Sequence, residues 1–335
     1  MKYQSMLCRK SLLILVVFTL ILVFGFHTTV HAQERVLLTI GAPPTTSPIY
    51  AYYVGISKAI KSVYPNIETT VTECQGGIDV TKRLRQGLVD FGVSLSDGLY
   101  QSRKGIGTFQ DKPSADLRVL WSYANQPNQW VVRKDSGIKF VNELTDKMFN
   151  PGGKGGSIVT MTQDIFNLLG IKPKYYTASQ PDAIEAMVNR RVIGTAKSGP
   201  VPDSFVMQVA ASAPIEIVGL TEEEMKKVLK AFPYLIEYKI PRGAYTGTSE
   251  AKSVSVIASA AATKSMPQEV GYKLFKAMWE GGKTHWQAAY LDGKDVDVPG
   301  LTMKSMELLH SGSVQYLKEK GFNVPNHLVP PEYKN

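Results

Sequence analysis

The sequence predicts an α/β fold with two lobes, on three observations. Apolar runs alternate with amphipathic segments almost throughout the chain, which is the pattern of strands that alternate with helices. A strand that runs into a loop of small residues at the start of a helix occurs in both halves. The 335 residues are enough for two lobes, and no low-complexity linker separates them. We therefore expect the chain to cross between the lobes along strands, at 129–133 and 253–259.

The first 32 residues are predicted to be a secretory signal peptide. A basic start at 1–10 precedes an almost wholly apolar stretch at 11–26, and Val30 and Ala32 fit the small-residue rule for cleavage after Ala32. The alternative is a retained membrane anchor, but the apolar stretch is shorter than the roughly 18 to 20 residues that a membrane span needs. We expect export to the periplasm, where the cleaved protein would be soluble.

Charge and cysteine content restrict the possible partners and cross-links. Removal of the signal peptide takes away three bases and no acids, so the net charge of +9 falls by three. This modest basic excess is compatible with an anionic partner. No run of Lys and Arg with interleaved aromatic residues occurs, so we expect no nucleic-acid binding. Cys8 would leave with the signal peptide, and Cys74 alone cannot form an intramolecular disulfide.

The first half contains two consecutive strand–loop–helix units, which predicts a parallel sheet. Ser47 can cap the first helix, and Pro48 suits its first turn. Gly87 ends the second helix before another strand at 89–97. The expected elements are a strand at 35–40, a loop at 41–47, a helix up to Val63, a strand at 67–73, a loop at 74–77 and a helix at 78–86.

The second half repeats this pattern after two strands, "LRVLWSY" and "QWVVR". The run "KMFNPGGKGGS" predicts a strand that enters a glycine-rich loop, and the helix after it should end at Gly170. Thr221 and Glu224 form a capping box at the start of a further helix. The other expected elements include strands at 213–220 and 253–265, and helices from Pro267 and over 303–320.

Three of the small-residue loops are candidates for anion binding at a helix N-terminus. They are 43–50, 74–77 and 152–157, and the third adds the ammonium group of Lys154 and the hydroxyl of Ser157. Free backbone N–H groups and the helix dipole favour an anion there. Such turns occur in every α/β protein, so the alternative for each is a purely structural turn. Three of them in two lobes favour a ligand site, because ligands bind beyond the carboxyl ends of strands.

The sequence lacks the motifs of catalysis and of metal binding. His285, His310 and His327 show no metal-ligand spacing, and no G-x-S-x-G elbow occurs. Cys74 is interpreted as a small buried residue beside a turn, with a reactive thiol as the alternative. We therefore predict no catalytic residue, no metal and no cofactor.

Some aromatic and polar residues have both a structural and a ligand-binding interpretation. Tyr52 and Tyr53 share the apolar face of the first helix and are predicted to be core. Tyr50 lies off that face, where it could line a pocket. Ser96 and Asp97 are expected at the end of a strand, with Asp97 as the cap of a turn.

Six segments are informative in their order and spacing, and the best markers among them are "RKDSGIK" and "IPRGAYTG". The segments are "SPIYAYYVGISKAI", "ECQGGIDVTKRLRQGLVDFGVSLSDGLYQS", "WVVRKDSGIKFVNEL", "NPGGKGGSIVTMTQDIFNLLGI", "FPYLIEYKIPRGAYTG" and "LLHSGSVQYLKEKGF". Together they resemble the TAXI-type solute receptors of TRAP transporters, across essentially the whole chain after residue 32.

The resemblance implies a two-lobed, periplasmic-binding-protein-like fold of type II, with the ligand in the cleft between the lobes. We place lobe I at 33–132 and 253–335 and lobe II at 133–252. The resemblance also implies that the chain delivers a small carboxylate, such as a dicarboxylate or an acidic amino acid, to integral membrane TRAP permease subunits. We expect a monomer that is not an enzyme. Carried over by position, the ligand contacts are Thr46, Ser47, Tyr50, Gln75, Gly76, Gly77, Ser96, Gly156 and Ser157.

Two departures from the family pattern affect the expected pocket. The first loop is poorer in glycine and serine, and Leu95 stands where a polar residue, often glutamine, is usual. Lys154 and Lys197 are further candidates for ligand contact, and the alternative for Lys197 is an exposed, solvated lysine. This combination favours a dicarboxylate or a bulkier acid, clamped when Ser157 and Lys154 close over its carboxylate. The rival hypotheses are an exported enzyme that acts on a small acid through Cys74 or a distant histidine, and a soluble sensor partner.

Overall fold

The computed structural model describes residues 35–45, 47–154, 157–290 and 293–334, and Leu37–Asn335 form one compact unit. The expected signal peptide and its cleavage site lie outside the described residues. Two of the expected ligand contacts, Thr46 and Gly156, also lie outside them. In the part of the chain that is described, no helix has the length and apolar character that a membrane span requires.

The N-terminal elements alternate between strand and helix. They are β1 (Val36–Ala42), α2 (Pro48–Val63), β2 (Ile67–Glu73), α3 (Gly77–Arg85), β3 (Phe91–Leu95) and α4 (Ser96–Lys104). β1 pairs in parallel with β3, with Ile40 opposite Phe91, so the predicted parallel pairing is confirmed. Ser47 caps α2 as predicted, because its hydroxyl accepts a hydrogen bond from the backbone N–H of Ile49 at 3.3 Å.

The predicted strand at 89–97 is wrong at its C-terminal end. β3 ends at Leu95, and Ser96 and Asp97 belong to the first turn of α4, a helix that the sequence did not predict. Leu95 is the N-cap residue, has an extended backbone, and offers no side-chain acceptor to the helix. The usual start signal of a helix, a polar capping residue, is therefore missing here.

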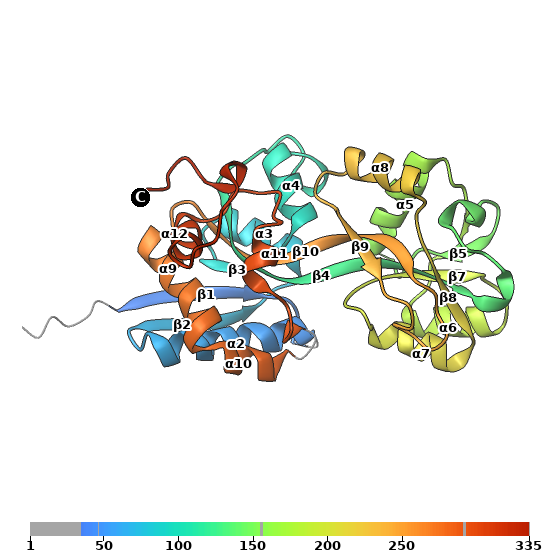
Figure 1. Ribbon diagram of the computed structural model, residues 1–335, viewed down its shortest axis with the longest axis horizontal. Coiled ribbons are helices and arrows are strands. Elements are labelled where there is room, and N and C mark those ends of the chain that lie inside the picture. Colours follow the sequence, from blue (N-terminus) through green and yellow to red (C-terminus); the bar gives the residue numbers. More distant parts are fainter. Residues whose placement is uncertain (1–34, 46, 155–156, 291–292, 335) are drawn as a thin grey trace, which may run out of the picture. The chain divides into compact units, whose positions relative to one another are not determined.

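Two long antiparallel strands, β4 (Leu117–Arg133) and β10 (Ala251–Thr263), occupy the middle of a ten-stranded sheet (Figure 1). The strand order is β2-β1-β3-β10-β4-β7-β5-β6, with β8 paired to β4 and β9 paired to β10. β4 is one continuous strand where the sequence predicted two. It pairs with β10 up to Pro127 and with β7 from Asn128 onward. The lobe boundaries expected at 132/133 and 252/253 fall within these two strands and remain a prediction.

The elements after β4 alternate in the same way. They are β5 (Met148–Asn150), α5 (Ser157–Leu169), β6 (Lys174–Tyr175), α6 (Gln180–Val188), β7 (Gly194–Ser198), α7 (Ser204–Ser212), β8 (Ile215–Val218), α8 (Glu222–Ala231) and β9 (Ile236–Ile240). The capping box of Thr221 and Glu224 at the start of α8 is confirmed. Gly170 follows α5 with a φ of 74°, the left-handed conformation that ends a helix. The sequence did not predict α7, which the carboxylate of Asp203 caps.

Large aromatic side chains on α2 and β4 lie in the interior of the protein. Tyr52 and Tyr53 are fully buried, so their prediction as core residues is confirmed. Tyr52 stacks on Tyr123 with ring centroids 4.2 Å apart, and its hydroxyl accepts a hydrogen bond from the indole N–H of Trp121 at 2.8 Å. Trp130 is also fully buried, in a separate apolar cluster. These aromatic residues therefore belong to the core of the protein.

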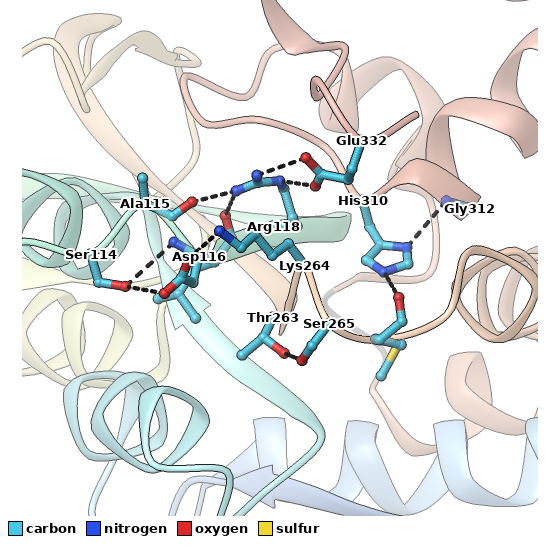
Figure 2. Close-up of polar contacts among 12 residues, drawn as sticks. Ser114, Ala115, Asp116, Arg118, Thr263, Lys264, Ser265, His310, Gly312 and Glu332 are labelled. Carbon is cyan, nitrogen blue, oxygen red and sulfur yellow. Dashed lines mark hydrogen bonds and ion pairs between the residues drawn. The ribbon is translucent and has the colours of Figure 1, made fainter. Parts of the chain in front are cut away.

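Several of the C-terminal helices contact β4. The elements are α9 (Gln268–Lys276), a π-helical turn (Ala277–Gly281), α10 (Lys283–Ala289), α11 (Val298–Thr302) and α12 (Ser311–Glu319). Among them, α9, α11 and α12 pack against β4. The helix expected over 303–320 begins only at Ser311, because His310 is its N-cap residue. Near the C-terminus, Glu332 accepts two hydrogen bonds from Arg118 on β4, at 2.6 and 3.0 Å (Figure 2).

Candidate functional site

Two helices, α3 and α4, begin side by side. A Cβ atom added to Gly98 in the first turn of α4 would lie 3.1 Å from Cδ1 of Ile78 in the first turn of α3. Gly76 precedes α3 with a φ of 135°, a conformation that favours glycine. No side chain caps α3. The backbone N–H groups of its first turn therefore remain available to an acceptor from outside the helix.

A cavity of about 380 Å³ lies at these helix starts. Four of the expected ligand contacts line it, namely Gln75, Gly76, Gly77 and Ser157. The first three come from the loop before α3, and Ser157 begins α5. The structure thus brings together residues from two of the three small-residue loops that the sequence singled out.

A second cavity, of about 400 Å³, shares Ser157 with the first. Lys154 and Lys197, the two lysines singled out in the sequence, both line this second cavity. Asn150, at the end of β5, shapes the adjoining loop because its side-chain oxygen accepts a hydrogen bond from the backbone N–H of Gly152. Two cationic side chains and a hydroxyl therefore surround a space next to the first cavity.

Lys197 already has a partner within the protein. Its Nζ lies 3.7 Å from Oδ2 of Asp203, and that aspartate also caps α7. The Lys197 side chain is 25% exposed, so it is neither buried nor the fully solvated lysine of the alternative interpretation. Of the two lysines at this cavity, Lys154 is the more exposed. We regard Lys154 as the stronger candidate for pairing with an anionic ligand.

Three other expected ligand contacts have structural roles or lie away from these cavities. Ser47 caps α2, and neither Ser47 nor the half-buried Tyr50 lines the two cavities. Ser96 is buried, and its hydroxyl donates to the carbonyl of Tyr234 at 2.8 Å and accepts from the backbone N–H of Ile257 at 3.1 Å. These bonds hold the start of α4 against two other segments of the chain. Ser47, Tyr50 and Ser96 therefore line neither of the two cavities.

Asp97 is the residue at the first cavity that the sequence analysis assigned incorrectly. It was expected to cap a turn, but it lies in the first turn of α4 and lines the first cavity. It is only 7% exposed, and its Oδ1 atom has no hydrogen-bond partner. Burial raises the pKa of this carboxyl group, while the backbone N–H groups of Gly98 and of Asp97 itself lower it in part. The sequence analysis missed this position of Asp97 because it did not predict the start of α4. A residue in the first turn of a helix can face a site at the helix N-terminus.

A larger cavity, of about 750 Å³, is lined by none of the expected ligand contacts. Most of its charged side chains already bond within the protein. Lys252 pairs with Glu222, Lys134 donates to the carbonyl of Gly247 at 2.6 Å, and Glu216 accepts from the backbone N–H of Ser249. Its volume alone would favour this cavity as the ligand site. Its paired charged side chains do not, because they are already engaged within the protein.

Comparison with known proteins agrees with this architecture. The sequence profile of the NMT1-like family matches residues 40–321. The chain belongs to the NMT1-like family. A TctC solute binding protein from Polaromonas superposes with a TM-score of 0.54 at 14% identity, over 87% of this chain and 99% of that chain. The aliphatic sulphonate binding protein SsuA from Escherichia coli gives a TM-score of 0.46 at 13% identity, over 88% and 96%. The predicted α/β, periplasmic-binding-protein-like fold is therefore confirmed.

Cys74 and His310 of this NMT1-like protein are structural. Cys74 is buried as predicted, and burial raises the pKa of its thiol, which disfavours the reactive thiolate. His310 is buried, and both of its ring nitrogens are engaged, by the carbonyl of Met266 and the backbone N–H of Gly312 (Figure 2). Among the described residues, no group of three or more His, Cys, Asp or Glu side chains could hold a metal ion.

Proposed function

We propose that this NMT1-like protein is an extracytoplasmic solute-binding protein that captures a small carboxylate. The observation that carries the proposal is the convergence of the uncapped start of α3, the hydroxyl of Ser157 and the ammonium group of Lys154 on two adjoining cavities. Backbone N–H groups at a helix start and a nearby cation favour a negatively charged ligand. Cavities of 300–1,000 Å³ are typical of small-molecule sites, and both cavities lie in that range.

The finer parts of the proposal concern the transport system. We propose that the chain is a TAXI-type receptor that passes its ligand, as a monomer, to the integral membrane permease subunits of a TRAP transporter. It would act in the periplasm after cleavage of the signal peptide, with lobe I at 33–132 and 253–335 and lobe II at 133–252. Support comes from the order of the segments in the sequence and from two similar folds, described as a solute binding protein and a sulphonate binding protein.

Two rival functions lead to different observations. An exported enzyme would convert its ligand to a product, and burial raises the pKa of the Cys74 thiol, which disfavours Cys74 as its nucleophile. A sensor partner would bind the same ligand but would not support its uptake. Recovery of the ligand unchanged after binding separates a receptor from an enzyme, and uptake by cells that carry the permease separates transport from sensing.

The first experiment is a thermal-shift screen of protein produced from the full chain and stripped of bound ligand. The panel contains mono- and dicarboxylates, amino acids, aromatic acids and, as neutral controls, the corresponding amides. A ligand at about 100 times its Kd stabilises the folded state by about 2.7 kcal/mol, which raises Tm by a few degrees. A carboxylate that shifts Tm, is recovered unchanged and has an inactive amide supports the proposal. A folded protein that no carboxylate stabilises contradicts it.

A further inference from the structure

We infer that Asp203 makes the site selective for acids with a single negative charge, because it neutralises Lys197 and leaves Lys154 to pair with the ligand. This inference rests on the proposed function. It gives Asp203 a part in ligand selectivity, and it reverses the preference for a dicarboxylate that the two lysines predicted from the sequence.

The second cavity lies beyond the carboxyl ends of three parallel strands. β5 pairs in parallel with β6 and with β7, and a helix follows each of these strands. Ser157 of α5, Gln180 of α6 and Phe205 of α7 all line the cavity. This edge of an α/β sheet is where ligands bind. An anion in the cavity therefore meets the starts of three helices.

The three helix starts differ in the acidic groups that they already hold. Asp203 is the N-cap residue of α7, and its Oδ1 accepts from the backbone N–H groups of Phe205 at 2.9 Å and Val206 at 3.2 Å. α6 has Asp182 in its first turn. The first turn of α5 contains no acidic residue, and Lys154 precedes that helix. Since an acidic group in the first turn already complements the helix dipole, the start of α5 is where an external carboxylate is favoured.

Lys197 does not provide a second cationic position of equal strength. The charged side chains that line the second cavity are those of Lys154 and Lys197. Nζ of Lys197 lies 3.7 Å from Oδ2 of Asp203, whereas no carboxylate of the described residues pairs with Lys154. A Cβ atom added to Gly199 would lie 2.5 Å from Oδ2 of Asp203 and 3.3 Å from Cε of Lys197, so the bare backbone of Gly199 leaves room for the pair. One positive charge thus remains for the ligand.

Hydrogen bonds within the interior hold Asp203 in place beside its lysine. The backbone N–H of Asp203 donates to the hydroxyl of Tyr245 at 2.7 Å, and that hydroxyl donates to Oε1 of Gln129. Nε2 of Gln129 donates to the carbonyl of Gly199 at 3.2 Å. Asp203, Tyr245 and Gln129 are all buried. A second carboxylate on the ligand would therefore compete for the lysine with a carboxylate that the fold already fixes there.

The test compares acids in which a carboxylate replaces a methyl group, by calorimetry on protein from the full chain. The pairs are butyrate and succinate, pentanoate and glutarate, and 4-methylbenzoate and terephthalate. In the wild-type protein we expect the better monocarboxylate to bind at least about 10-fold more tightly than its dicarboxylate counterpart, because the second charge has no free partner.

Asp203→Asn should shift this preference toward the dicarboxylate by about 10-fold, because it releases the ammonium group of Lys197 and keeps a side chain that caps α7. Asp297→Asn makes the same change at the exposed N-cap of α11 and should keep the wild-type preference. The double variant Asp203→Asn/Lys197→Gln should lose the shift, because Asp203 acts through Lys197. A purely structural role of Asp203 would instead change the affinities for both acids alike.

The outcomes separate this inference from the proposed function. If dicarboxylates bind the wild-type protein as tightly as the monocarboxylates or more tightly, the inference is overturned while the carboxylate receptor stands. The same holds if Asp203→Asn keeps the wild-type preference, or if the double variant keeps the shift. If no acid of either kind binds, the carboxylate proposal itself fails and the inference falls with it. Asp203→Ser, with another residue that caps helices well, takes the place of Asp203→Asn if that variant does not fold.

Discussion

Two buried polar regions of this protein differ in whether their hydrogen bonds are complete. Around Arg118, the guanidinium donates to both oxygens of Glu332 and to the carbonyl of Ala115, and nearby His310 has partners at both ring nitrogens (Figure 2). At the first cavity, Asp97 is equally hidden from water but leaves one oxygen unpaired. A completed network stabilises the fold, whereas a buried carboxylate oxygen without a partner lowers its stability.

The largest expected effect comes from breaking the completed network. Arg118→Met should lower the free energy of unfolding by about 3 kcal/mol, because the carboxylate of Glu332 loses its partner in a partly buried position. Urea unfolding at pH 7 measures this change. Lys264→Met is the matched control, because Lys264 pairs with Asp116 at 2.7 Å but both side chains are about half exposed. Such a surface pair contributes less than about 1 kcal/mol. Equal losses in the two variants would contradict the comparison.

The next effect concerns ligand binding at Lys154. Lys154→Ala should weaken binding of the carboxylate found in the screen by about 10- to 100-fold, because a charge-assisted hydrogen bond is lost. Calorimetry measures the Kd of both proteins. Lys58→Ala, at an exposed position on α2, should bind the ligand as the wild-type protein does. If Lys154→Ala binds with unchanged affinity, Lys154 does not belong to the site.

A third prediction concerns the stability of the unliganded protein as a function of pH. The pKa of Asp97 is raised in the folded state by burial, so the folded protein binds a proton at this group more tightly than the unfolded chain does. The stability that this proton provides is present below the ordinary pKa of 3.8 and is lost as the pH rises through the raised value. Asp97→Asn should therefore gain stability relative to wild type on going from pH 3 to pH 7, measured by urea unfolding.

Asp79 provides the opposite case at the same cavity. Desolvation opposes the shift, but the backbone N–H of Gln75 and the side chain of Arg83 together lower the pKa of the Asp79 carboxyl group. The stability that it contributes is present above its ordinary pKa and is lost as the pH falls. Asp79→Asn should therefore lose stability relative to wild type near neutrality and approach it in acid. The same sign for both variants would refute the distinction between the paired and the unpaired carboxylate.

The smallest expected effect is the titration of His310. Burial lowers the pKa of its imidazole, so the folded protein holds the neutral ring. The stability that the neutral ring provides is present above the ordinary pKa of 6.5 and is lost as the pH falls below it. The Tm of the wild-type protein should fall between pH 7.5 and 5.5 more than that of His310→Asn, which keeps a capping side chain. His327→Asn, at an exposed position, should behave like wild type.

Local chemistry allowed the sequence by itself to determine much of this fold. The hydroxyl of Ser47 and the capping box of Thr221 with Glu224 act within a few residues of their helix starts, so their roles follow from spacing. The periodic burial of Tyr52 and Tyr53 follows from the helical repeat in the same way. The loops at 74–77 and 152–157 were also identified as candidate sites from their composition.

Only the tertiary structure decided which polar groups remain free for a ligand. Lys197 meets Asp203, and Ser96 bonds to Tyr234 and Ile257, through contacts with residues that are not adjacent in the sequence. α4 has no polar capping residue, so its start, and with it the position of Asp97, could not be recognised from local sequence. Whether a buried carboxylate is paired depends on which donors the fold brings within about 3 Å, and no local pattern encodes that distance.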